Sequence, residues 1–224
     1  MLHGNSFGWR ENVIRHICAS AWAVTILSMT FFTPRAFAAS KIFSPDAERV
    51  NLYKTLNFET YKATGTEEER EATEERLALV KPAAFFLEGA QKIEERITVL
   101  VIGMMFCPDC KAVYPYVEAM KAANPFISVR YLERSAPGAR EFMLSRTGRA
   151  NVPMIFGVRP DGTKGNRDGK IWGKSYTETP ERVTGLLQAA KTERERSTVW
   201  KDFHAGVYDE DIQRDLLDLI LQAD

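Results

Sequence analysis

Cysteine and histidine are scarce in this sequence, and their small number excludes several kinds of site. The 224 residues include only three cysteines and three histidines. Three cysteines cannot form the dense disulfide scaffold of small secreted domains. Basic and acidic residues balance at 30 each, and no basic stretch is interleaved with aromatic residues, so nothing indicates a nucleic-acid partner. The composition, 45% hydrophobic, is that of a globular chain with one substantial core.

The first forty residues lack the long apolar run of a membrane-spanning helix but have the three parts of a secretory signal. Two arginines precede an apolar stretch over residues 17–32, which is shorter than the ~20 residues needed to span a bilayer. Small residues then form an A-x-A pattern ending at Ala38, which predicts cleavage before Ala39. We therefore expect residues 1–38 to be a signal peptide and the mature chain to be periplasmic or otherwise exported, and soluble. An uncleaved N-terminal membrane anchor is the alternative.

Cleavage would leave a single pair of cysteines, Cys107 and Cys110, together with one histidine, His204. Zinc is usually held by four Cys, His or carboxylate ligands, so a metal site would need His204 with a carboxylate or a second subunit. We expect no metal and no other cofactor. A purely structural disulfide would close a very short loop and would stabilise the fold little. A redox pair is the interpretation with a positive physical basis.

The pair lies where an apolar run gives way to a helical pattern. Residues 97–105, with the sequence ITVLVIGMM, are typical of a strand buried on both faces. If Cys107 caps the following helix, Pro108 falls at the first helical position and Cys110 at the third, on nearly the same face. The free N–H groups and the positive end of that helix would stabilise a thiolate at Cys107, the expected nucleophile. Cys110 would be within reach to resolve a mixed disulfide.

Asp109, between the two cysteines, opposes the effect of the helix end. A carboxylate ~6.5 Å from the sulfur, at an effective dielectric constant of ~20 to ~80, would disfavour the thiolate by roughly 0.6 to 2.5 kcal/mol. We expect a higher Cys107 pKa, and a more reducing pair, than a neutral residue at this position would give. Asp109 could instead act in proton transfer to Cys110, or be only an acid at a helix start.

The order of predicted elements indicates an α/β domain over residues 97–190. Residues 39–96 form a predicted N-terminal extension. Its helical patterns span residues 44–58, 66–80 and 83–96, and Pro82 separates the last two. Strands are expected over residues 97–105, 126–132, 152–158 and 170–173, and helices over residues 111–123, with an interruption at Pro115, 138–148 and 179–191. The helices between the first three strands predict parallel crossovers, and the short last link predicts a hairpin.

Residues 191–224 are expected to form a C-terminal helical extension. Its apolar residues recur at helical spacing, at Ile212, Leu216, Leu219 and Ile220. Amphipathic helices usually cover the core of their own chain, so we expect this stripe to dock on the body. A helix that binds a partner is the alternative.

Two prolines, Pro115 and Pro153, help to identify the family to which the cysteine motif belongs. Pro115 follows the first cysteine of the Cys-x-x-Cys-Lys motif within the same predicted helix, and Val152-Pro153 opens a later strand. With the buried strand before the motif, these features resemble the thioredoxin superfamily over roughly residues 97–190. Within it, the chain is most similar to bacterial exported thioredoxin-like proteins with a Cys-Pro-Asp-Cys motif. The resemblance implies a thioredoxin-like fold, a central mixed sheet flanked by helices, here with helical extensions at both ends.

The resemblance also implies roles for individual residues. Cys107 would be the exposed attacking thiol and Cys110 the more buried resolving thiol. Pro153 would be a cis-proline facing the disulfide, and Val152 would offer backbone groups to an extended substrate. The two neighbours of the attacking thiol would also contact the substrate: Phe106 and Pro108.

The sequence departs from the thioredoxin pattern at two positions. Thioredoxins usually have Trp before the first cysteine, where this chain has Phe106, and a buried acid six positions before it, where this chain has Val101. The proton-transfer role of that acid is then unfilled or passes to Asp109.

We therefore expect an exported thiol–disulfide oxidoreductase that acts on protein thiols and disulfides through Cys107 and Cys110. The Asp109 charge favours a reductase over an oxidase, and an exported reductase would need electrons from a membrane donor. The alternative is a non-catalytic thioredoxin-like module that senses redox state or binds a partner.

Overall fold

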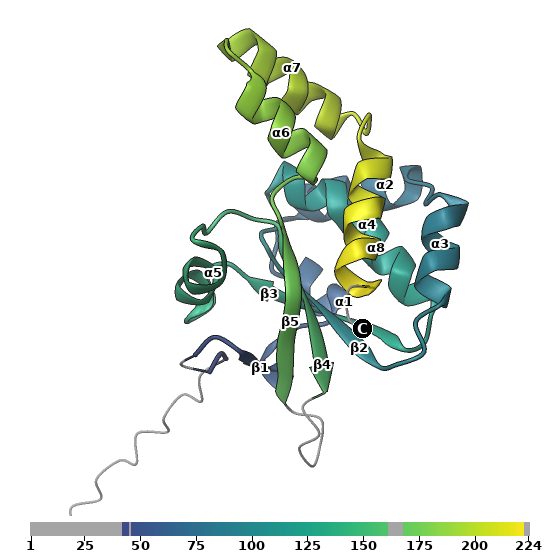
Figure 1. The fold of residues 1–224 in the computed structure, drawn as a ribbon, viewed down its shortest axis with the longest axis vertical. Coiled ribbons are helices and arrows are strands. Elements are labelled where there is room, and N and C mark those ends of the chain that lie inside the picture. The colour runs from purple at the N-terminus through teal and green to yellow at the C-terminus, as the bar shows by residue number, and fades with distance from the viewer. Residues whose placement is uncertain (1–41, 45, 161–167, 222–224) are drawn as a thin grey trace, which may run out of the picture. The chain divides into compact units, whose positions relative to one another are not determined.

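Five strands form one mixed sheet in the order β1-β5-β4-β2-β3 (Figure 1). The strands are β1 (Arg49–Asn51), β2 (Ile97–Gly103), β3 (Ile127–Glu133), β4 (Met154–Pro160) and β5 (Asp168–Thr177). The central strand β2 runs parallel to β3 and antiparallel to β4, and β5 runs antiparallel to both β4 and β1. This is the α/β thioredoxin-like arrangement that the sequence predicts.

The computed structural model describes residues 42–44, 46–160 and 168–221. The predicted signal peptide, residues 1–38, and most of the predicted hairpin link lie outside these ranges. Within them, no helix is both long enough and apolar enough to cross a membrane.

One predicted crossover is wrong, because β4 is antiparallel to β2 rather than parallel to it. The helix before β4 is α5 (Ala139–Thr147), whose nine residues rise only about 14 Å. The preceding strand β3 has seven residues and is about 23 Å long, so α5 is too short to return the chain to the starting end of the sheet. The predicted hairpin between β4 and β5 is confirmed.

The helix predicted over residues 44–58 is also wrong. This segment contains β1 and a short 3₁₀ helix, η1 (Leu52–Lys54), and the first α-helix begins only at Phe58. Val50 of β1 is almost fully buried and pairs with Gly169 of β5. Pairing at the sheet edge therefore overrides the local helical spacing, since β-structure depends on partners distant in the sequence.

The remaining helices agree with the patterns in the sequence, except α1, most of which lies between two predicted helices. They are α1 (Phe58–Lys62), α2 (Glu67–Leu79), α3 (Ala84–Gln91), α4 (Pro108–Ala123), α6 (Glu181–Ala189), α7 (Glu193–His204) and α8 (Asp209–Leu221). Pro82 lies between α2 and α3, as expected. The expected interruption at Pro115 does not occur, because α4 continues through this residue.

Each face of the sheet has its own apolar cluster, and β2 contributes to both. Val99 and Val101 face a cluster shared with helices α1, α3, α4, α7 and α8. Leu100 and Ile102 face the opposite cluster, which α5 and the segment around β1 cover. Because both faces of β2 are buried, residues 99–103 are continuously apolar.

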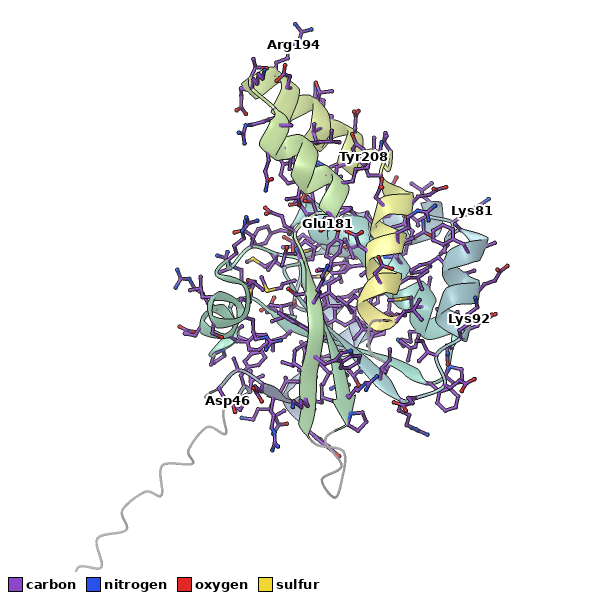
Figure 2. The ribbon with its side chains drawn as sticks, viewed as in Figure 1. Asp46, Lys81, Lys92, Glu181, Arg194 and Tyr208 are labelled. Atoms are coloured by element: carbon purple, nitrogen blue, oxygen red, sulfur yellow. The ribbon has the colours of Figure 1, made fainter. Side chains whose placement is uncertain are left out.

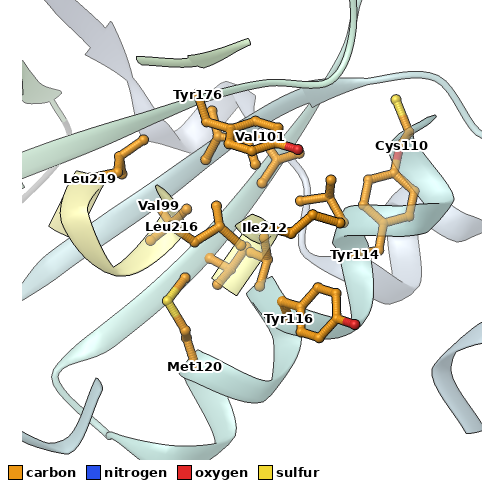
Figure 3. Packing of buried hydrophobic residues seen from close by; sticks show 14 of the residues in the cluster. Val99, Val101, Cys110, Tyr114, Tyr116, Met120, Tyr176, Ile212, Leu216 and Leu219 are labelled. Carbon is orange, nitrogen blue, oxygen red and sulfur yellow. The ribbon is translucent and has the colours of Figure 1, made fainter. Parts of the chain in front are cut away.

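The apolar stripe of α8 docks on the body, as predicted. Ile212, Leu216, Leu219 and Ile220 are each at most 3% exposed. Figure 3 shows Leu216 and Ile212 lying between Val99 of β2 and the α4 residues Tyr116 and Met120.

Helices α6 and α7 form a hairpin that extends away from the sheet (Figure 1). Arg194, near the start of α7, lies at the end of the hairpin far from the sheet, and Tyr208, just after α7, lies close to α8 (Figure 2). The C-terminal end of α7 is thus brought back to the body. Phe203, in the last turn of α7, is fully buried in the cluster that contains α4.

Candidate active site

Cys107 lies at the junction between β2 and α4, where a tight turn ends the strand. Its N–H donates a hydrogen bond to the carbonyl of Met104 at 3.1 Å. Cys107 is the N-cap residue of α4, with an extended backbone, and Pro108 is the first helical residue, as the sequence predicts. Proline fits there because the first N–H groups of a helix have no intrahelical acceptor.

The environment of Cys107 favours its thiolate. A hydrogen bond from the Cys110 thiol, followed by the N–H groups of Cys110 and Asp109, lowers the Cys107 pKa below its usual value. Burial and the negative charge of Asp109 act in the opposite direction. The Cys110 thiol and the N–H groups of the helix start together outweigh burial and Asp109, and Cys107 is the better nucleophile of the pair.

Cys110 lies one turn into α4 and is fully buried, whereas Cys107 is 8% exposed. Burial raises the Cys110 pKa well above its usual value, and the hydrogen bond to Cys107 raises it further. Both cysteines are free thiols in this structure. Cys110 therefore stays protonated while Cys107 is available to attack.

The loop before β4 faces Cys107 from the other side. The Val152–Pro153 peptide bond is cis, as the resemblance implies. The Cys107 thiol donates a hydrogen bond to the carbonyl oxygen of Val152 at 3.6 Å. Pro153 is buried and Val152 half-buried, so a backbone acceptor adjoins the reactive sulfur.

The two predicted substrate contacts next to Cys107 lie on the surface. Phe106 is 61% exposed, an unusual environment for an aromatic side chain, and Pro108 is also exposed. The sulfur therefore sits beside an exposed apolar rim. The contact of these residues with a substrate stays a prediction.

A pair of buried tyrosines lies behind Cys110. The hydroxyl groups of Tyr114 and Tyr61 are 2.8 Å apart, and the Tyr114 hydroxyl is hydrogen bonded to the Cys110 sulfur. Tyr114 lies beside Cys110 on α4 (Figure 3). A Cβ atom on Gly103 would be only 2.6 Å from the Tyr114 hydroxyl, so the absence of a side chain at Gly103 makes room for it. Thioredoxins usually have a buried acid where this chain has Val101, which is fully buried. Here the two tyrosine hydroxyl groups provide the polar surroundings of Cys110 instead.

Asp109 is paired with a residue from the C-terminal extension. Its Oδ1 atom is 2.6 Å from Nε2 of His204, in the last turn of α7. Burial raises the Asp109 pKa, while the hydrogen bond and charge of His204 lower it. Asp109 is therefore neither an isolated helix-start acid nor exposed to solvent, since its side chain is only 15% exposed.

The sequence analysis missed His204 and both tyrosines as parts of the site. Tyr114 could have been found, because it lies four residues after Cys110 and so shares its helix face. His204 lies 95 residues from Asp109, and no local pattern links the two. In the part of the chain that the structure describes, no group of three or more His, Cys, Asp or Glu side chains could hold a metal ion.

The mixed sheet, the cysteine pair at a helix start and the adjoining proline define a thioredoxin-like protein. A family model described as Thioredoxin matches residues 55–191, more than half of the chain. The chain therefore belongs to this thioredoxin family. A separate search of curated proteins finds no match to the sequence.

Two solved structures share the fold. A protein of unknown function from Pseudomonas aeruginosa is similar with a TM-score of 0.61 and 19% sequence identity, over 78% of this chain and 97% of that one. An HIV epitope-scaffold is similar with a TM-score of 0.59 and 18% identity, over 77% of this chain and 96% of that one. At these identities the likeness concerns the fold alone.

Proposed function

We propose that this chain is an exported thiol–disulfide oxidoreductase that acts on protein substrates through Cys107 and Cys110, as a reductase rather than an oxidase. One observation carries the proposal. The two thiols are hydrogen bonded to each other, with the Cys107 pKa lowered at a helix start and the Cys110 pKa raised by burial. Such a pair divides the roles of attacking and resolving thiol.

The reaction would proceed by two exchange steps. The Cys107 thiolate attacks one sulfur of a substrate disulfide, and the other substrate sulfur leaves as a thiolate that takes up a proton. The Cys110 thiol then loses its proton, attacks the Cys107 sulfur, and releases the second substrate thiol. The substrate gains two electrons and two protons, and Cys107 and Cys110 form a disulfide. A dithiol of a membrane electron donor would then reduce the Cys107–Cys110 disulfide and restore the two thiols.

The direction and compartment rest on sequence arguments. The N-terminal pattern over residues 1–38 predicts export. The negative charge of Asp109 raises the Cys107 pKa, which disfavours the reduced thiolate form and makes the pair more reducing than a neutral residue there would. The exposed Phe106 beside Cys107 and the Val152 carbonyl facing it are suited to an extended peptide around the substrate cysteine.

The decisive experiment combines turnover with trapping. We expect the purified chain to reduce insulin with a dithiol donor, and Cys107→Ser to abolish this activity. Cys110→Ser should instead accumulate a mixed disulfide on Cys107 when it is mixed with oxidised substrate proteins, because the resolving thiol is missing. Cys107→Ser is the matched control for the trapping. Absence of both Cys107-dependent turnover and a mixed disulfide would exclude an exchange enzyme.

A second candidate is a redox-sensing or partner-binding module without turnover. The observation in its favour is that the α6–α7 hairpin, which extends away from the sheet, contacts the site through His204. The same assay separates the two functions. Reversible oxidation of the Cys107–Cys110 pair without insulin turnover would favour the module.

A further inference from the structure

The contact between Asp109 and His204 joins two helices at the ends where their charges are most favourable. Asp109 lies in the first turn of α4, where the helix dipole stabilises an anion. His204 lies in the last turn of α7, where the dipole stabilises a cation. The separation of 2.6 Å between Nε2 and Oδ1 is short, as expected of a hydrogen bond to an ionised group.

His204 is held in place by the packing of α7 independently of Asp109. Its ring stacks on Trp200 with a centroid distance of 5.8 Å and an interplanar angle of 23°. The neighbouring Phe203 is fully buried in the main core. The end of α7 is therefore anchored by apolar contacts, and the ion pair is not needed to keep the imidazole near α4.

The other groups that face Asp109 are acidic. Glu178, in the connection between β5 and α6, repels the Asp109 charge, and the Cys107 thiolate and Asp109 repel each other. Among the described residues whose interactions with Asp109 are resolved, His204 is the one that favours its ionised form. Without His204, no other described residue with a resolved effect on Asp109 would compensate its negative charge at the start of α4.

We propose that His204 is a positioning residue of the redox pair, whose imidazole compensates the charge of Asp109 and so keeps Cys107 available as a thiolate. The inference rests on the proposed function and deepens it, because it makes α7 a part of the redox site. When the His204 imidazole is protonated, its charge cancels much of the repulsion that the Asp109 carboxylate exerts on the Cys107 sulfur one helical turn or less away. The reducing bias expected from Asp109 alone is correspondingly weakened.

The test measures the thiolate at Cys107 directly, from the pH dependence of its alkylation by iodoacetamide in the reduced full-length chain. His204→Gln retains a hydrogen-bond donor but removes the group that can carry a positive charge, and His204→Phe retains the stacking on Trp200. An uncompensated carboxylate at this distance should lower the thiolate-to-thiol ratio of Cys107 roughly threefold to a hundredfold in both variants. The reduction potential against glutathione should become more negative.

The Asp109→Asn background shows whether His204 acts through Asp109. Asp109→Asn alone should raise the thiolate-to-thiol ratio and make the potential less negative, and adding His204→Gln should then change the ratio by less than about twofold. Arg194→Gln removes one positive charge from the far end of α7 and should leave the ratio unchanged. A ratio that stays at the wild-type value in His204→Gln, or falls equally in the Asp109→Asn background, would overturn the proposal.

The two proposals fail in different ways. If the wild-type chain does not reduce insulin, the proposed function fails, although the alkylation profile still shows whether His204 controls Cys107. If the wild-type chain turns over and the His204→Gln profile is unchanged, only the role of His204 is refuted.

Discussion

Two thiols on one helix turn have opposite properties because only one of them lies at the helix end. The first N–H groups of α4 are directed at Cys107, whereas Cys110 is surrounded by apolar side chains and the Tyr114 hydroxyl. Burial penalises a thiolate in both positions, but at Cys107 the hydrogen bond from the Cys110 thiol, together with the N–H groups of Cys110 and Asp109, outweighs it. The spacing of the motif is therefore sufficient to assign attack and resolution to different sulfurs.

This difference predicts the pH dependence of alkylation. In the reduced chain, Cys107 should react with a midpoint below its usual pKa, while Cys110 should remain unmodified until well above it. Mass spectrometry of the two modified peptides would measure both profiles. Equal rates at the two cysteines, or a Cys107 midpoint above about 9, would contradict the assignment.

The same shift has a consequence for stability. Because the Cys107 pKa is lower in the folded chain, its thiolate stabilises the reduced fold at a pH above the unfolded value of about 8.5, and this contribution is lost as the pH falls through the folded pKa. The stability difference between the reduced wild type and Cys107→Ala, from urea unfolding, should therefore grow between neutral and alkaline pH. A difference that shrinks with rising pH would show that the pKa is not lowered.

Tyr114 should assist the second exchange step. Its hydroxyl hydrogen bond lowers the pKa of Cys110 against the opposing effect of burial. Tyr114→Phe removes only this hydroxyl, so decay of the mixed disulfide should slow roughly tenfold to a hundredfold, the value of a hydrogen bond to a charged group. The first attack by Cys107 should keep its rate. Stopped-flow kinetics with a single-disulfide substrate would separate the two steps.

A second buried tyrosine on α4 provides the control for this prediction. Tyr116 is 1% exposed, and its hydroxyl is hydrogen bonded to Asp209 rather than to sulfur. Tyr116→Phe should leave both exchange steps unchanged. If the two variants slowed the second step equally, the effect would come from packing of α4 and not from the Tyr114 hydroxyl.

At the scale of elements, α8 is a structural helix that closes the core over β2 and α4. Leu216 is fully buried, whereas Leu221, at the end of the same helix, is 41% exposed. Leu216→Ala should lower the free energy of unfolding by about 2–5 kcal/mol, from lost burial and the cavity left behind. Leu221→Ala should change it by less than about 0.5 kcal/mol. Urea unfolding of both variants would test this, and similar losses would show that α8 does not dock through its stripe.

The elements that could be predicted from the sequence are those whose signals are local. The stripe of α8, the buried strand β2 and the left-handed Gly148 that ends α5 all follow from spacing within one segment. The strand β1 and the direction of β4 did not, because each depends on a partner strand far along the chain. A local helical pattern at residues 44–58 could not reveal that Val50 pairs with β5.

The same limit applies to the site. Cys107, Cys110 and the cis-proline Pro153 follow from motifs, and the structure brings them together. His204 could not be assigned, because its role arises only when α7 returns to the start of α4. His204 is the single histidine outside the predicted signal peptide, but its partner is visible only in three dimensions.

At the scale of the molecule, carboxylates tie the C-terminal helices to the rest of the fold. Asp109 of α4 meets His204 of α7, and Asp209 of α8 meets Arg76 of α2 at 2.9 Å. Asp215 of α8 accepts a hydrogen bond from the N–H of Glu181, the first residue of α6, at 2.7 Å. The helices beyond the sheet are therefore positioned by charge as well as by apolar packing.

Asp215 should destabilise the fold at neutral pH although it makes one of these contacts. Burial raises its pKa, the charges of Glu181, Asp218 and Asp211 raise it further, and the Glu181 N–H lowers it. A raised pKa means that the contribution to stability is present below the unfolded value of about 3.9 and is lost as the pH rises through the folded value. Asp215→Asn keeps an acceptor for the Glu181 N–H without the charge, so it should be more stable than the wild type at pH 7.

The gain should shrink as the pH falls, because the wild-type carboxyl group then becomes neutral too. Urea unfolding at pH 7 and at progressively lower pH would measure this trend. Glu210→Gln removes a charge from an exposed position on the same helix and should have a small effect, within about 1 kcal/mol, because its pair with Arg214 is exposed. A lower stability of Asp215→Asn at neutral pH would contradict the prediction. It would mean that the Asp215 charge stabilises the contact between α8 and α6 by more than burial of the charge destabilises the fold.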